Sequence, residues 1–248
     1  MPAGRIRIGC AGWTLPADVQ QAFPPGDSHL ARYARVFAAS EINSSFHRPQ
    51  RPSTYARWAD SVPADFAFSA KLPRRITHEG RLADAGPGLD AFFAEAGALG
   101  DRLHCVLVQL PPSLAFDAPV AAAFVAALHE RHAGLVALEP RHASWFTPEV
   151  DGWLAERRIA RVLADPVRHA PGAAPGGWAG LVYLRLHGSP RMYYSAYPAP
   201  VLAALATRMR EAAAQGSQVW CIFDNTAAGA AAGDALQLQR LLAQTQGG

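Results

Sequence analysis

Short apolar runs alternate along this chain with alanine-rich segments in which apolar residues recur at helical spacing. The apolar runs have the length of strands and are bounded by turn residues. They span residues 5–9, 39–43, 66–72, 103–110, 135–139, 160–164, 181–188 and 218–225. The segments of helical period span residues 30–38, 89–99, 118–130, 148–157, 200–215 and 227–243. The pattern therefore predicts eight strands, most of them followed by a helix.

Strands and helices that alternate in this way predict an α/β fold with parallel strands. Eight repeats within 248 residues are typical of a TIM-type (β/α)8 barrel, and a doubly wound open sheet is the alternative. No internal repeat or linker divides the chain, so we expect a single barrel-like domain over residues 1–248. The connection after the sixth strand is irregular, because residues 165–180 include PGAAPGGWAG, which is unsuited to a helix. We expect an active-site lid or a degraded helix there.

The third predicted strand, FAFSAKL, illustrates how strand ends build a site. Phe66 and Phe68 share one face and suit the side covered by helices, because side chains alternate along a strand. Ala67, Ser69 and Lys71 then point toward the interior. Since the carboxyl ends of barrel strands line the active site, we expect a pocket with Lys71 at its mouth.

Most other predicted strands also end in a polar or charged side chain. Barrel interiors pack in layers drawn from alternate strands, so we expect Lys71, Glu139 and Arg185 at one level, as catalytic residues. Buried charges are costly unless they are paired, which makes such a cluster a functional candidate. In the structural alternative, Lys71 pairs with Glu41 or Glu139 and only fills the mouth. The ligand-binding candidates at or just beyond strand ends are Glu41, Asn43, Arg141, His187, Asp224 and Asn225, with Gln109 beside them.

Lys71 is the only lysine among the 23 lysine and arginine residues of the chain. An ammonium group changes protonation state or points at one ligand atom, whereas a guanidinium stays charged and binds through a planar fork. We therefore interpret Lys71 as an electrostatic and hydrogen-bonding group for an oxyanion. A Schiff base is the alternative, which nearby carboxylates would oppose by keeping the amine charged.

Aromatic side chains follow the seventh predicted strand in RMYYSAY, residues 191–197. Tyr193 and Tyr197 are candidates for stacking on a base or a sugar. Trp13 and Phe46 occupy other rim loops and have the same potential role. The alternative is that these aromatic residues simply cap the barrel.

After the eighth predicted strand, DNTAAGAAAG suits an anion site at the start of a helix. Asn225 or Thr226 would cap that helix, and the small residues after them would let a ligand approach free backbone N–H groups. Barrels often hold phosphate in the loops after strands seven and eight. We expect Arg185 and His187 to supply the side-chain donors, and an ordinary alanine-rich helix start is the alternative.

Composition restricts the partners. A net charge of +3 is too small for a strongly basic nucleic-acid-binding face, so nucleic acid is a possible partner that composition does not favour. There is no signal sequence and no 18-residue apolar stretch, so we expect a cytoplasmic protein without a membrane partner. The three cysteines lack C-x-x-C spacing and suit reduced, buried thiols. The oligomeric state is left open.

No cofactor is predicted, because the phosphate-loop, dinucleotide, zinc-protease and nucleophile-elbow motifs are all missing. His47, His142 and His187 come near strand ends that also carry carboxylates, but their spacing does not require a metal. Lys71 and Arg185 would compete with a cation for those carboxylates. We therefore predict no metal site.

Seven motifs, spread in fixed order over nearly the whole chain, provide a further argument. They are GCAGW (9–13), EINSSFHRP (41–49), FSAKLPRRITH (68–78), VQLPPS (108–113), LEPRHASW (138–145), LRLHG (184–188) and FDNTAAGAAA (223–232). Together they resemble the YecE-like family, a widespread domain of unknown function. The resemblance implies a TIM-type barrel with some likeness to phosphodiester-cleaving and sugar-isomerising barrels, and it implies no reaction. Pro140 and Asp224 depart from the family's usual aromatic residue and asparagine.

Two functional hypotheses follow. The first is a metal-independent hydrolase, lyase or isomerase that acts on a small anionic substrate, phosphorylated or carboxylated. Glu139 would be its general acid or base, and Lys71 and Arg185 would neutralise developing charge. The second is a barrel that binds or processes nucleic acid through rim arginines and stacking tyrosines.

Overall fold

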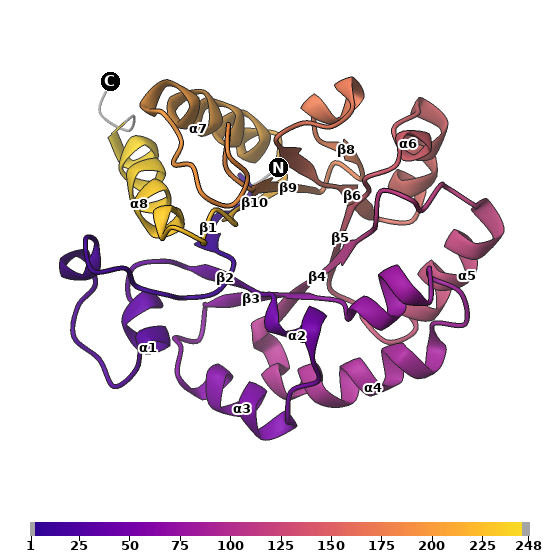
Figure 1. The fold of residues 1–248 in the computed structure, drawn as a ribbon, viewed down its shortest axis with the longest axis horizontal. Helices are drawn as coiled ribbons and strands as arrows, with labels where there is room; N and C mark the ends of the chain where they lie inside the picture. Colours follow the sequence, from indigo (N-terminus) through magenta and orange to yellow (C-terminus); the bar gives the residue numbers. More distant parts are fainter. Residues whose placement is uncertain (1–2, 245–248) are drawn as a thin grey trace.

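The computed structural model describes residues 3–244 and has a mixed α/β fold with mainly parallel strands. In Figure 1 the strands lie toward the centre and the helices toward the outside. The strands are β1 (Ile6–Cys10), β2 (Ala39–Ile42), β3 (Ala67–Lys71), β4 (Leu103–Gln109), β5 (Leu135–Glu139), β6 (Ile159–Arg161), β7 (Leu163–Asp165), β8 (Gly176–Gly177), β9 (Leu181–Leu186) and β10 (Gln218–Phe223). One sheet has the order β2-β3-β4-β5-β6-β8, and the other has the order β1-β10-β9-β7.

The helices follow the predicted pattern, and their first turns show why they begin where they do. The side chain of Asp117 caps α5 and that of Thr147 caps α6, and each helix has a proline in its first turn. No helix within residues 3–244 is long and apolar enough to cross a membrane. The helices are α1 (His29–Tyr33), α2 (Ser44–His47), α3 (Pro52–Asp60), α4 (Gly86–Ala96), α5 (Ala118–His129), α6 (Pro148–Glu156), α7 (Ala199–Ala214) and α8 (Ala230–Ala243).

All eight predicted strands are present, and the structure corrects some details. The sixth is split at Val162, so that β6 pairs with β5 while β7 pairs with β9. The helix predicted over residues 30–38 ends at Tyr33, and α3 was not predicted. Helix α8 begins three residues later than expected, because Gly229 adopts a φ of +82° that ends the preceding loop.

The irregular connection after the sixth strand contains no regular helix, as predicted. It contains a 3-10 turn at Ala170–Ala173 and the short strand β8, which pairs antiparallel with β6. The segment therefore folds back across the end of the sheet. It also carries several side chains of the pocket described below.

Strand residues alternate between two hydrophobic clusters, as the sequence pattern predicts. Phe66 and Phe68 belong to the large cluster that also includes helix side chains. Ala67 belongs to a smaller cluster with Tyr183 and Trp220, which holds alternate residues of the strands. This alternation places Ser69 and Lys71 on the same side of β3 as Ala67.

The two sheets meet between β1 and β2, where only one isolated bridge joins the strands, from Ala11 to Glu41. The Tyr33 hydroxyl replaces part of the missing ladder, because it accepts from the Cys10 N–H at 2.7 Å and donates to the Ala39 carbonyl at 2.9 Å. Tyr33 is fully buried.

Two further residues support this contact between the sheets. The Ser40 hydroxyl lies 3.1 Å from the carbonyl oxygens of both Cys10 and Gly12. At Gly9, a Cβ atom would lie 2.0 Å from the Ala39 carbonyl oxygen, so a side chain there would push the strands apart. We call the contact formed by Gly9, Tyr33 and Ser40 the β1/β2 seam.

We expect Tyr33→Phe to lower the free energy of unfolding by about 1–3 kcal/mol, because it leaves a buried N–H and a buried carbonyl without their partner. Urea denaturation of both proteins measures the difference. Tyr194→Phe is the matched control, since Tyr194 is exposed and should change stability little. Equal effects of the two substitutions would show that the hydroxyl does not hold the seam together.

Candidate functional site

The guanidinium of Arg185 lies among three carboxylates contributed by other strands or their ends. Its Nη2 atom is 2.8 Å from Glu41 Oε1 and 3.0 Å from Asp224 Oδ2, and its Nη1 atom is 3.1 Å from Glu139 Oε2. All four residues are buried. Burial opposes the charge of Arg185, but the three carboxylates outweigh it and raise the pKa of Arg185 well above its ordinary value. We call these four residues the Arg185 cluster.

Below the cluster, the Tyr183 hydroxyl donates to Glu41 Oε2 at 2.8 Å and lies 3.0 Å from the Ser69 hydroxyl. Burial and the charge of Glu41 raise the pKa of Tyr183 well above its ordinary value, so it remains a neutral donor. Tyr183 was not predicted as a site residue. It precedes Arg185 by two positions and therefore shares its face of β9, which is a signal that strand alternation provides.

His187 lies between two of the carboxylates. Its Nδ1 atom is 3.0 Å from Asp224 Oδ2, and its Nε2 atom is 3.4 Å from Glu139 Oε1. Burial lowers the pKa of His187, but Glu139 and Asp224 outweigh it and raise the pKa above its ordinary value. Burial raises the pKa of Glu139, but Arg185 and His187 outweigh it and hold that pKa well below its ordinary value. The contact between His187 and Glu139 therefore favours the protonated form of the imidazole and the ionised form of the carboxyl group.

Lys71 differs from the other cations of this region. Its ammonium lies 3.9 Å from the centre of the Phe46 ring, and within residues 3–244 it forms no hydrogen bond or ion pair. Burial and then the charge of Arg185 lower the pKa of Lys71 to about 8, against the weaker opposite effect of the carboxylates. The structural alternative, an ion pair with Glu41 or Glu139, is not formed.

Other predicted residues surround the Arg185 cluster. Arg141 donates to Glu139 Oε1 from Nε at 3.1 Å and from Nη2 at 3.0 Å, and Gln109 donates to the same oxygen at 3.4 Å. When the Asn43 amide is oriented so that both its nitrogen and its oxygen have partners, the nitrogen donates to Glu41 at 3.1 Å and the oxygen accepts from Arg185 at 3.3 Å. Each carboxylate therefore has several donors.

Four predicted residues make contacts elsewhere. Trp13 packs edge-on against Trp58, with ring centres 5.0 Å apart. The Tyr197 hydroxyl donates to Asp165 at 2.7 Å and accepts from the Gly188 N–H at 2.8 Å, so it fastens the loop after β9. The other two residues are Asn225 and Thr226.

The predicted cap of the last helix is wrong. Gly229 is the N-cap of α8, and the Asn225 amide instead donates to Asp234 Oδ2 at 2.7 Å. Thr226 is exposed in the loop before the helix. The side-chain donors expected to bind an anion here, Arg185 and His187, both face the carboxylate of Asp224. Two other cations, Arg141 and Arg168, lie on the other side of Glu139.

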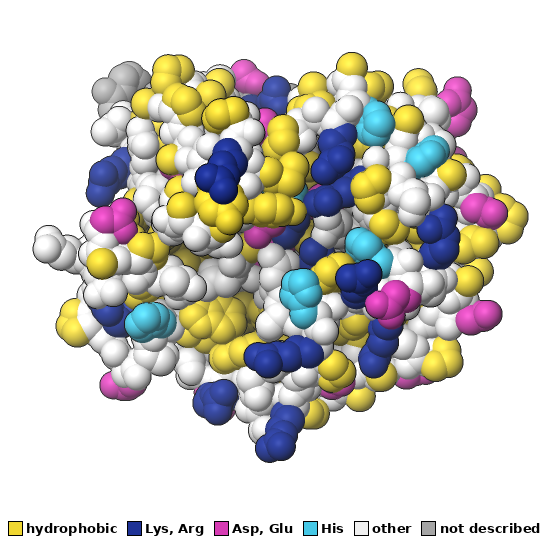
Figure 2. Space-filling model, in the orientation of Figure 1, with side chains coloured by type: hydrophobic (Ala, Val, Ile, Leu, Met, Phe, Trp, Pro, Cys, Tyr) yellow, Lys and Arg dark blue, Asp and Glu magenta, His cyan; other side chains and the backbone are white. Residues whose placement is uncertain are grey.

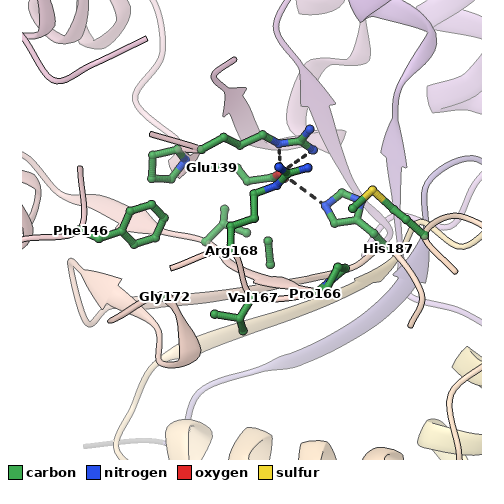
Figure 3. Close-up of a pocket in the computed structure, with 12 residues that line it drawn as sticks. Glu139, Phe146, Pro166, Val167, Arg168, Gly172 and His187 are labelled. Carbon is green, nitrogen blue, oxygen red and sulfur yellow. Dashed lines mark hydrogen bonds and ion pairs between the residues drawn. The ribbon is translucent and has the colours of Figure 1, made fainter. Parts of the chain in front are cut away.

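A small pocket lies on that side, between the ends of β5 and β7, and has a volume of only about 20 Å³ in this structure. Figure 3 shows Glu139, Arg168 and His187 extending toward the same part of it. Arg168 is exposed, and its guanidinium makes no hydrogen bond or ion pair with any of residues 3–244. Its position in the irregular connection gave no signal in the sequence. We call this space the β5/β7 pocket; its walls include Arg141, Phe146, Val167, Gly172 and Met192.

Tyr193 lies against His187, with ring centres 5.6 Å apart and the rings perpendicular. Its φ of +69° is unusual for a residue with a side chain, and two backbone hydrogen bonds, to His187 and Ala227, hold it there. Tyr194 packs instead on Arg191, at 3.9 Å. Of the two, Tyr193 is the one that the loop fixes beside the charged residues.

The face shown in Figure 2 is predominantly basic near its centre. Lys and Arg side chains and several His side chains gather there around a hollow. Within residues 3–244, no three His, Cys, Asp or Glu side chains are grouped as metal ligands. The carboxylates of the Arg185 cluster converge on the guanidinium.

These features define the class: an α/β protein whose parallel strands end in a buried cluster of charged side chains. Residues 7–248 match the family model described as a protein of unknown function, DUF72. The chain belongs to this family, which confirms the resemblance that the motifs indicated. It is also 29% identical over 106 residues to the UPF0759 protein YecE of Escherichia coli K12. That match covers 43% of this chain and only 38% of the relative.

Solved structures of the same family share the fold. A DUF72 family protein from Enterococcus faecalis V583 superposes with a TM-score of 0.81 at 21% identity, over 96% of each chain. One from Thermotoga maritima MSB8 gives 0.77 at 22% identity, over 96% of this chain and 99% of that one. At this level of identity the likeness concerns the fold alone.

We expect Arg185→Met to lower the free energy of unfolding by about 3–5 kcal/mol at pH 7, because it leaves buried carboxylates without their cation. The loss should shrink as the pH falls to 5. In the wild type the depressed pKa values of Glu139 and Asp224 contribute stability that is still present at pH 5, because it is lost only below the ordinary range of carboxylates. In the variant we expect the pKa values of these carboxylates to be raised, so that they take up protons at pH 5. Their protonation removes the cost of burying unpaired negative charge.

Urea denaturation at both pH values measures this difference, with Arg57→Met on the exposed face of α3 as the control. A loss that is equal at pH 5 and pH 7 would contradict the assignment of the carboxylates as the source of the cost.

Proposed function

We propose that the two sheets are one closed TIM-type barrel, and that its carboxyl-end face binds and transforms a small anionic substrate by acid-base chemistry. The split strand supports closure on one side, because β6 pairs with the first sheet and β7, one residue later, pairs with the second. The β1/β2 seam supports closure on the other side. The strand order then follows the chain, as in (β/α)8 barrels.

The observation that carries the proposal for an anionic substrate is the unpaired state of Lys71. Three carboxylates around Arg185 satisfy its charge, whereas the ammonium of Lys71 lies over the Phe46 ring and has no hydrogen bond or ion pair within residues 3–244. A cation that is largely withdrawn from water and has no carboxylate partner attracts an anionic ligand. The exposed Arg168 supplies a second cation to the same end of the strands.

Glu139 connects these two cations. It lines the β5/β7 pocket and is one of the carboxylates whose charge acts on Lys71. A substrate above Glu139 lies against the wall with Arg141 and Arg168, at the same end of the strands as Lys71. This is the position that we assign to the anionic substrate.

His187 is the better proton donor of the site. Its pKa is raised by Glu139 and Asp224, so it holds a proton more strongly than an ordinary histidine, and it also lines the β5/β7 pocket. Glu139, with its lowered pKa, stabilises that charge and orients the ring. We therefore assign proton transfer to His187 and the supporting role to Glu139, in a hydrolase, lyase or isomerase reaction that uses no metal in this assignment.

We expect Lys71→Arg to fold normally and to lose affinity for the substrate by about 2–4 kcal/mol, because a longer planar group does not fit a site shaped for one ammonium. A thermal-shift screen of anionic metabolites that includes phosphate and pyruvate identifies the best ligand. Titration calorimetry then compares wild type, Lys71→Arg and Arg168→Ala with the control Arg57→Ala. Wild-type affinity in Lys71→Arg would refute the role of Lys71.

A second candidate function is nucleic-acid binding, which one further observation favours. A second hollow lies beside the ends of β2 and β3, and its walls include Phe46, Arg48, Arg74 and Arg75. Arg74 pairs with Glu79 at 3.3 Å, so part of this positive charge is already neutralised. The arrangement suits phosphate contacts at a rim more than a closed site.

Since the net charge is only +3, duplex DNA should bind no more tightly than about micromolar at physiological salt, and the affinity should fall steeply as salt is raised. Fluorescence anisotropy over a salt series measures both. Sub-micromolar binding that resists salt would favour the nucleic-acid function over the small-substrate function.

A further inference from the structure

A hollow of about 600 Å³, open to solvent, lies at the opposite end of the strands from the Arg185 cluster. Its walls form where β4, β5 and β10 begin, at His104, Leu135 and Gln218. Glu139 and Arg185, by contrast, lie at or next to the carboxyl ends of β5 and β9. We call this hollow the amino-end pocket; its other walls include Asp101, His129, Arg158 and Trp178.

The buried Arg7 of β1 lies against this pocket. Its neighbours Ile6 and Ile8 pack with the large hydrophobic cluster, so strand alternation directs Arg7 to the other side of β1. There it is in register with Trp220, and its guanidinium carbon lies 5.5 Å from the centre of the Trp220 ring. Arg7 Nη1 donates at 3.3 Å to Gln218 Oε1, and Gln218 lines the amino-end pocket. These contacts place a guanidinium that is only 4% exposed at the wall of the pocket.

Arg7 differs from the other buried arginines of the described chain in having no counter-ion. Arg161 pairs with Asp151 at 2.7 Å, and Arg185 lies among three carboxylates. Arg7 forms no ion pair with any of residues 3–244, and its side chain donates there only to Gln218. Because a guanidinium stays charged even when it is buried, this one attracts an anionic ligand.

Unpartnered donors gather at the same end of the strands. Within residues 3–244, three buried side-chain nitrogen atoms have no hydrogen-bond partner: Arg7 Nε, Arg102 Nε and Trp220 Nε1. Arg102 directly precedes β4, and Arg7 and Trp220 lie in the amino-terminal halves of β1 and β10. These groups can only donate, so each requires an acceptor, which is water or an ion. Two of the three are cationic, which favours an anion with several oxygen atoms.

His104 connects both cations with the pocket. It is one of the lining residues, and its pKa is lowered by burial and then by Arg7, Arg5 and Arg102, against the opposite effect of Asp101. Arg5 is itself held by an ion pair outside the pocket, so Arg7 and Arg102 are the cations with charge to offer. The neutral imidazole adds a further hydrogen-bond donor.

We propose that the amino-end pocket binds the phosphate group of a small ligand, with Arg7 and Arg102 as its cations and His104 as a neutral donor. A planar guanidinium suits two oxygen atoms of one phosphate. The pocket is larger than a phosphate ion and so has room for the organic part of a phosphate ester. This site lies at the other end of the strands from the proposed substrate site, and it adds a binding function that does not depend on that site.

Phosphate titrations followed by NMR of the histidine rings test the proposal. The His104 signal, identified by its loss in His104→Gln, reports on the amino-end pocket, and His78, after β3, reports on the opposite end. We expect phosphate to shift the His104 signal saturably at pH 7. Arg7→Met should weaken this binding at least about tenfold, because it removes a charge-assisted hydrogen bond. Arg102→Met should weaken the same binding, and it decides the test if Arg7→Met does not fold.

Arg57→Met, on the exposed face of α3, is the matched control and should keep the wild-type affinity. Wild-type affinity in Arg102→Met and in a folded Arg7→Met would overturn the proposal. A phosphate shift at His78 without one at His104 would overturn it too, since water would then satisfy the unpartnered donors. That result would leave the proposed function standing, because calorimetry with Lys71→Arg tests the opposite end.

Two further ligands define what the site recognises. Adenosine 5′-monophosphate that binds at His104 more tightly than phosphate would identify a phosphate ester as the ligand, and equal or weaker binding would identify the free ion. Sulfate keeps its charge over the range in which histidine titrates, so bound sulfate should raise the lowered pKa of His104. Saturating sulfate that leaves this pKa unchanged would contradict an anion site beside His104.

Discussion

The charge of Arg185 is the constraint on which the rest of the site depends. A guanidinium at this depth is stable only because Glu41, Glu139 and Asp224 surround it. Those carboxylates come from, or directly follow, β2, β5 and β10, so the cation holds strand ends that are far apart in the sequence at fixed positions. Tyr183, Asn43, Gln109 and Arg141 then satisfy the carboxylate lone pairs that Arg185 leaves free. With its charge committed to this network, Arg185 acts on Lys71 and His187 as a fixed source of field.

That fixed field gives neighbouring groups different protonation tendencies. Lys71, without a carboxylate in contact, releases its proton more readily than an ordinary lysine. His187, between two carboxylates, retains its proton more strongly than an ordinary histidine. One buried ionic network therefore shifts the proton affinities of a lysine and a histidine in opposite directions.

The sequence predicts the alternation of strands and helices well, because the strands are short apolar runs and helices such as α5 and α6 begin with ordinary cap residues. It also places Lys71, Glu139 and Arg185 in one region, since strand alternation and parallel order determine their direction. The sequence does not predict which partner each charged side chain contacts. The pairing of Arg185 and His187 with Asp224, and not with an external anion, is a matter of three-dimensional distance. Arg168 lies in a segment without periodicity, and α8 begins at Gly229 because of a backbone conformation that the alanine-rich sequence does not reveal.

The β1/β2 seam has a consequence for how the molecule moves. Elsewhere neighbouring strands are joined by repeated backbone hydrogen bonds, which must all break together if two strands slide. At the seam, two side-chain hydroxyls and one bridge carry the contact, so a small displacement there disturbs few bonds. Glu41 is part of that bridge and also part of the Arg185 cluster. A displacement of the strands along this line therefore moves Glu41 and changes the electrostatic field at the Arg185 cluster.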